Sequence, residues 1–206
     1  MRGQLLLAGV LLCFLYNAAS LILGAAYNAL FLLYLVYFSA SFYAFILAFA
    51  SVDRPALAAH ISPRMPNRGL AAFLCLAGLS PCVWLIPVIA AVVQGQPAPA
   101  GLAHYTTDVT TVLDVSLITP ACFLAGALLL RRAPLGYLLG STLLVLLSLI
   151  GLIVVGQTGM QILDGVRLGA GEIAAFVAPF VSLSAIATGL NFRLIQHIAE
   201  PDAEHA

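Results

Sequence analysis

Asp114 is the residue whose type and surroundings most directly suggest chemistry. It stands in an otherwise apolar run, VTTVLDVSLITPACFLAG, which begins at Val109. A carboxylate in such a run is costly to bury unless something compensates its charge, and ionisable residues inside membrane helices are functional candidates by default. Thr107, Thr110 and Thr111 precede Asp114 by seven, four and three residues, so a helix places them on the same face.

The environment of Asp114 is expected to be polar and irregular. Pro120 has no backbone N–H, so the carbonyl of Ser116 loses its partner in a regular helix. Asp114 is too far from the start of its helix to act as a cap, and it should therefore face the bundle interior and touch a polar group. The candidate partners are Asn17, Tyr34, Thr110, Thr111 and Arg167.

Asp108 and Glu172 have a simpler interpretation. Both are expected near the start of a helix, where a negative charge favours the helix dipole and can cap backbone donors. Around Asp114, however, the acids outnumber the single cation, Arg167. Two interpretations stay open: a structural pairing of Asp114, or an acidic mouth for a cation, a proton or an amine-bearing ligand. The candidate binding residues are Tyr105, Thr107, Asp108, Thr110, Thr111, Asp114, Arg167 and Glu172.

Composition defines the class of protein. The chain has 206 residues, of which 63% are hydrophobic and 8% charged, with no lysine and a net charge of zero. These values predict an integral membrane protein in contact with the lipid bilayer, and there is no basic tract for nucleic acid. The sequence has no metalloprotease, nucleophile-elbow or phosphate-loop motif, no CxxC pair and no mid-helix histidine. An enzyme is therefore disfavoured, and no cofactor or metal is expected.

The long uncharged stretches give the number of membrane crossings. Residues 5–50 carry no charge; as one helix they would measure ~69 Å, over twice the ~30 Å hydrocarbon layer. They must cross twice, with a turn at residues 24–28. The whole chain, 1–206, is predicted to be one all-α membrane domain of six transmembrane helices. The expected helices span about residues 4–24, 28–50, 69–93, 107–130, 135–156 and 171–195.

Arginine placement predicts the orientation of this bundle. With six crossings, Arg167 falls on one side, and seven arginines fall on the other: Arg2, Arg54, Arg64, Arg68, Arg131, Arg132 and Arg193. Because cytoplasmic loops are enriched in Lys and Arg, both termini are expected to be cytoplasmic, in the inner membrane. A cleaved signal peptide in place of the first helix is the alternative, and it would leave the polarity unchanged.

Two patterns concern helix packing. Six aromatic residues follow one face of the second helix, at residues 31, 34, 38, 42, 45 and 49, and an ordinary packing stripe is favoured over a ligand-lining wall. Gly136 and Gly140 are four apart, which permits close approach of another helix, either within the chain or in a homodimer.

The segment from Tyr105 to Leu139 resembles a pattern in a group of uncharacterised bacterial multi-pass proteins, which have a YTT start, a Leu-Asp pair, a proline, a glycine, an LLRR end and a Gly-Tyr restart. The matching positions are Tyr105, Thr106, Thr107, Leu113, Asp114, Pro120, Gly126, Leu129, Leu130, Arg131, Arg132, Gly136 and Tyr137. The resemblance implies the six-helix architecture and no particular chemistry.

Two functions are consistent with these features. The first is a small polytopic protein that binds or transports a small solute, cation or proton through Asp114. The alternative is a non-catalytic accessory or scaffold subunit that acts through helix–helix contacts.

Overall fold

The computed structural model describes residues 1–95, 107–167 and 169–199, and within them the fold is all-α. Six segments are long and apolar enough to cross a membrane, which confirms the predicted polytopic bundle. The segments are α1 (Arg2–Gly24), α2 (Phe31–Ala50), α4 (Asn67–Leu79) continued by η1 (Ser80–Trp84) and α5 (Leu85–Val93), α6 (Val109–Leu113) continued by η3 (Asp114–Ile118) and α7 (Thr119–Leu130), α8 (Pro134–Leu163), and α9 (Ala170–Gln196).

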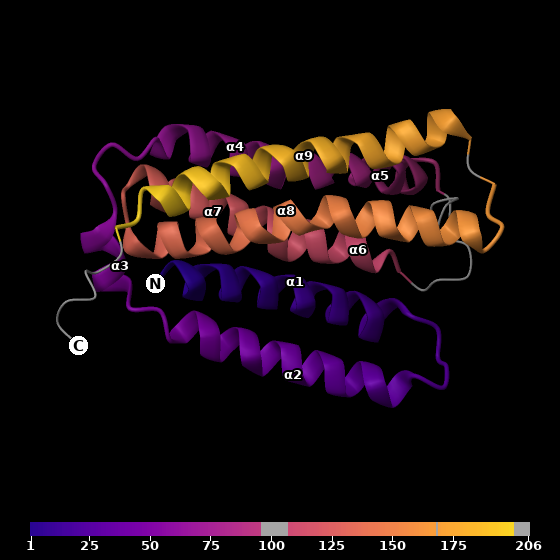
Figure 1. Ribbon diagram of the computed structural model, residues 1–206. Helices are drawn as coiled ribbons and strands as arrows, with labels where there is room; N and C mark the ends of the chain where they lie inside the picture. The colour runs from indigo at the N-terminus through magenta and orange to yellow at the C-terminus, as the bar shows by residue number, and fades with distance from the viewer. Residues whose placement is uncertain (96–106, 168, 200–206) are drawn as a thin grey trace.

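The six spans lie roughly side by side, with α8 at the centre (Figure 1). Helix α8 packs against α9, α1 and α7, while α4 packs against α7. Helix α2 lies at the edge and packs chiefly against α1. Five of the six residues of its aromatic stripe are half-buried. Phe42 is the exception, with 39% of its surface exposed. Beside the stripe, Tyr37 meets Phe14 of α1 edge to face, with ring centroids 6.5 Å apart.

The start of α1 and the end of α9 lie at the same end of the bundle (Figure 1). There the short helix α3 (Arg54–His60) leads into Ile61, which pairs with Ile198 beyond α9. The guanidinium of Arg2 donates to the carbonyl of Ile198 through Nε at 3.0 Å and Nη2 at 2.6 Å. These contacts tie the first span to the end of the last one, and both lie at the same end, as an even number of crossings requires.

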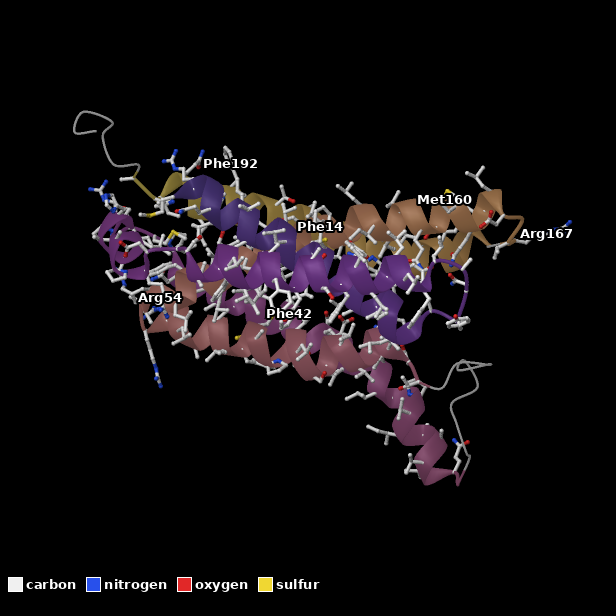
Figure 2. The ribbon with its side chains drawn as sticks, turned by 90° about the horizontal axis from the view of Figure 1, so that it is seen from below. Phe14, Phe42, Arg54, Met160, Arg167 and Phe192 are labelled. Atoms are coloured by element: carbon white, nitrogen blue, oxygen red, sulfur yellow. The ribbon has the colours of Figure 1, made fainter. Side chains whose placement is uncertain are left out.

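The same end carries the seven arginines assigned to it by the six-helix prediction. Arg54 lies at this end and Arg167 at the opposite one, with Phe14, Phe42 and Phe192 along the length between them (Figure 2). We call the two ends the arginine-rich end and the arginine-poor end. The arginine bias in the sequence thus corresponds to two ends of the bundle that differ in arginine content.

Two local predictions need correction. The sequence predicts a fifth helix that ends near residue 156, but α8 continues to Leu163 and ends before Gly165, whose φ is +86°. Gly156 and Gly159 do not end it, because glycine weakens a helix without removing a hydrogen bond. The loop at residues 51–69 also contains α3, which Asp53 caps by accepting from the N–H of Ala56 at 3.0 Å.

Glycines bring α4 and α7 into close contact. A Cβ added to Gly78 would lie 2.7 Å from Cβ of Cys122, and one added to Gly126 would lie 2.8 Å from Sγ of Cys75 and 3.3 Å from the carbonyl oxygen of Ala71. Such distances are shorter than van der Waals contact, so only glycine allows this approach.

Gly136 and Gly140 contact the preceding helix of the same chain. A Cβ at Gly136 would lie 2.6 Å from the backbone of Leu128, and one at Gly140 would lie 3.2 Å from Cδ1 of Leu129. Their close approach therefore serves the tight connection between α7 and α8.

Candidate functional site

Asp114 forms a hydrogen bond between two spans. It is half-buried at the start of η3, and its Oδ1 accepts from the phenol Oη of Tyr16 at 2.7 Å. Tyr16 is a half-buried residue of α1. The prediction that Asp114 touches a polar group is met, but by a residue that was not among the five candidates.

The pair lies in the half of the bundle toward the arginine-poor end. The end of α1 meets the start of α6, since a Cβ on Gly24 would lie 3.2 Å from Cγ2 of Val109. Asp114 is five residues from Val109, or ~8 Å along the axis, and Tyr16 is eight residues from Gly24, or ~12 Å. Both groups are therefore inside the apolar spans rather than at their ends.

Asp114 opens a π-helical turn. Its carbonyl accepts from the N–H of Thr119, five residues on, instead of four. Pro120 follows immediately and cannot donate, so the wider turn accommodates a break in the hydrogen-bond pattern. π-Turns inside α-helices are frequent at functional sites.

A second irregular segment packs against this turn. Pro81, in η1, cannot donate to the carbonyls of Ala77 or Gly78, which would take its N–H in an α- or a 3₁₀-helix. Ser80 Oγ donates to the Ala77 carbonyl at 2.8 Å, and Thr119 Oγ1 donates to the Gly78 carbonyl at 2.7 Å. The Thr119 bond links the two proline-containing spans beside Asp114.

Asp108 is the N-cap of α6, as one interpretation of the sequence predicted. Its carboxylate accepts from the N–H of Thr111 at 3.2 Å, from Thr111 Oγ1 at 2.6 Å and from Thr110 Oγ1 at 2.9 Å. Both threonine hydroxyls are engaged there, so the expectation that Thr110 or Thr111 partners Asp114 is wrong. Thr110 and Thr111 follow the N-cap by two and three residues, so they lie in the first turn, which the cap carboxylate reaches.

The Asp108 carboxyl supports a prediction about pH. Partial burial raises its pKa, but the hydrogen bonds from Thr111 and Thr110 outweigh burial and leave the pKa below its usual value. A lowered folded-state pKa contributes stability that is present at neutral pH and lost as the pH falls through that pKa. We expect Asp108→Ala to cost about 1 kcal/mol at neutral pH and less in acid. Thermal denaturation of the wild type and of Asp108→Ala, from neutral to acidic pH, measures this loss of stability. If the difference in stability between them does not shrink in acid, the capping role is contradicted.

The remaining candidate partners are engaged elsewhere or lie far from Asp114. Asn17 Nδ2 donates to the carbonyl of Cys13 at 2.8 Å, and Tyr34 Oη accepts from Asn28 at 3.4 Å. Arg167 is exposed beyond α8, at the arginine-poor end (Figure 2). Arg167, one of the candidate partners, therefore forms no salt bridge with Asp114 among the described residues.

The last three predicted site residues are Thr107, Glu172 and Tyr105. Thr107 is exposed just before the Asp108 cap. Glu172 belongs to the first turns of α9, and Tyr105 lies outside the described residues.

The arrangement gives Asp114 a neutral partner. Within the described ranges, Tyr16 is its hydrogen-bond donor, no arginine pairs with it, and no residue donates to Oδ2. No group of three or more His, Cys, Asp and Glu side chains in those ranges could hold a metal ion. A phenol orients the carboxyl group and does not balance the charge of a carboxylate.

No family model, curated protein or solved structure matches the chain. The resemblance to bacterial multi-pass proteins thus stays a prediction, and the site has to be interpreted from its own geometry.

Proposed function

We propose that this multi-pass membrane protein binds and transfers a proton or a small monovalent cation at Asp114. The observation that supports the proposal is the pairing of an intramembrane carboxyl group with the neutral Tyr16 phenol at 2.7 Å instead of with an arginine. Because none of the described residues pairs a cation with it, the carboxylate is neutralised by taking up a proton or a small cation, as an exchange site does.

The surroundings of the pair favour exchange over a purely structural role. The phenol can donate to the carboxylate when the site is empty, and Oδ2 can take the proton or cation without displacing it. The π-turn at η3 and the 3₁₀ turn at η1 place two irregular segments next to the site, where local rearrangement costs less than in a regular helix.

Ion flux in reconstituted vesicles tests this function. The wild-type protein should carry proton or cation flux down an imposed gradient, and Asp114→Asn should reduce it to the level of protein-free vesicles. Asp164→Asn is the matched control, because Asp164 is an exposed acid at the arginine-poor end. Equal flux from wild type and Asp114→Asn would contradict the proposal.

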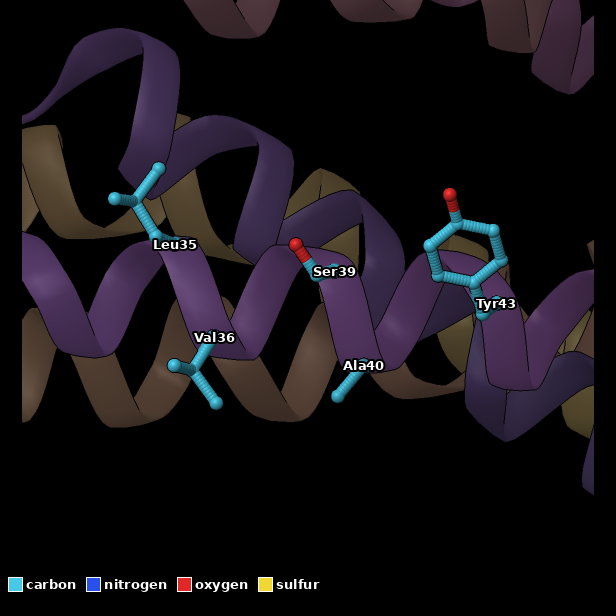
Figure 3. Close-up of a pocket in the computed structure, with 5 residues that line it drawn as sticks. All are labelled: Leu35, Val36, Ser39, Ala40 and Tyr43. Atoms are coloured by element: carbon cyan, nitrogen blue, oxygen red, sulfur yellow. The ribbon is translucent and has the colours of Figure 1, made fainter.

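The exposure of α2 favours a second function, that of an accessory subunit. Its outer face has a shallow groove in which Ser39 and Ala40 form a low floor between Leu35, Val36 and Tyr43 (Figure 3). A helix of another membrane protein fits such a small-residue surface. Ser39→Leu should then abolish co-purification of a partner. If the wild type and Ser39→Leu both purify as monomers without a partner, this function is contradicted.

Orientation belongs to the same proposal. We place the arginine-rich end in the cytoplasm and the protein in the inner membrane, on the seven-to-one arginine bias. In a cysteine-free background, cysteines at the exposed positions Pro63 and Val166 should react from opposite sides. Labelling of both from one side would refute the topology.

A further inference from the structure

A pocket at the arginine-rich end lies apart from Asp114. It has a volume of ≈ 430 Å³ and lies between the start of α4 and the end of α7. Residues 65–69 form one wall, and Leu130 and Arg132 form the other. Because both helices end here, the pocket lies at the level where membrane spans meet lipid headgroups.

The pocket is positively charged. Arg68 and Arg132 both line it, and none of its lining residues is acidic. The planar guanidinium group matches the oxygens of a phosphate, and basic pockets between transmembrane helices commonly bind phospholipid headgroups.

Asn67 fixes one wall of the pocket. It lines the pocket and is only 7% exposed. Its Nδ2 donates to Oη of Tyr137 at 2.8 Å, which ties the start of α4 to α8. The wall that carries Arg68 is therefore held in place by a buried hydrogen bond.

The backbone of Arg132 is held in an unusual conformation. Its φ is +54°, in the left-handed region where glycine is usual, and the N–H of Ala133 donates to the carbonyl of Leu128 at 2.9 Å. This is a Schellman ending of α7. Replacing Arg132 with Gly would fit the turn at least as well, so the turn alone does not account for an arginine.

We infer that this pocket binds a phospholipid headgroup, with the phosphodiester on Arg68 and Arg132. Apolar lining from Met65 and Leu130 suits the glycerol and upper acyl region of the lipid. The net negative charge of phosphatidylglycerol matches the two arginines, whereas phosphatidylcholine is zwitterionic.

Lipid titration of the delipidated, detergent-solubilised protein, followed by native mass spectrometry, tests this site. Phosphatidylglycerol, whose headgroup is anionic, should bind at least about threefold more tightly than zwitterionic phosphatidylcholine. Arg68→Gln and Arg132→Gly should each weaken that binding about fivefold or more. Arg131→Gln, the adjacent arginine outside the pocket, should change it less than about twofold.

The Arg132→Gly variant keeps the test interpretable. Its melting temperature should equal or exceed that of the wild type, so weaker lipid binding would not reflect unfolding. Equal loss from Arg131→Gln would indicate general surface charge and overturn the proposal, as would equal affinity for phosphatidylglycerol and phosphatidylcholine. Displacement of lipid by millimolar inorganic phosphate would assign the pocket to a soluble phosphate compound instead.

Discussion

Replacing Asp114 by Leu is expected to destabilise the protein by about 1–3 kcal/mol, because it leaves the Tyr16 hydroxyl without its acceptor inside the bundle. Asp114→Asn should cost less, since the amide oxygen still accepts from Oη. Tyr16→Phe removes the donor and should also destabilise. Thermal denaturation in detergent measures each effect.

The double variant shows whether these losses belong to one hydrogen bond. Tyr16→Phe combined with Asp114→Leu should cost clearly less than the sum of the two single variants, because either change alone removes the same contact. Strictly additive losses would mean that the two side chains do not interact. Ser116→Ala, on an exposed hydroxyl of the same turn, provides the control.

The second large effect is expected at the α4–α7 contact. Gly126→Leu places a side chain against Cys75 and the backbone of Ala71, where a Cβ alone would already lie within 3.3 Å. Overpacking of this kind costs about 1–3 kcal/mol or prevents assembly, since backbone cannot move aside as a side chain can.

Gly159→Leu is the matched control for that experiment. Gly159 is an exposed helical glycine, and a Cβ added there would have nothing within 4 Å. Leucine at this position should therefore be tolerated and improve helix propensity. Yield and melting temperature compare the two variants. Similar behaviour of Gly126→Leu and Gly159→Leu would contradict the close packing of α4 on α7.

The architecture was predictable because it depends on quantities that a sequence states directly. Hydropathy gives the lengths of the spans, and the arginine bias gives the end to which each loop belongs. The Asp108 cap was also predictable, since a cap is a contact between residues three apart. The sequence placed the end of α8 near residue 156, but the helix continues to Leu163 with a largely exposed last part. Neither length nor hydropathy fixes a helix end where the helix extends beyond its packing partners.

The partner of Asp114 was not predictable in the same way. Periodicity tells which residues share a face of one helix, but not which two helices are neighbours or at what height they meet. Tyr16 is reached only because α1 packs on α6 with Gly24 against Val109. The one available signal was that a tyrosine within an apolar span generally needs a partner for its hydroxyl.

The protonation of Asp114 itself is the measurement that tests the exchange site most directly. In infrared difference spectra of the reconstituted protein, we expect a carboxylic C=O band that appears as the pH falls, is absent in Asp114→Asn, and shifts in Tyr16→Phe because the phenol hydrogen bond is lost. A band that is missing at every pH, or one that Tyr16→Phe leaves in place, would contradict the assignment of Asp114 and Tyr16 as an ion-exchanging pair.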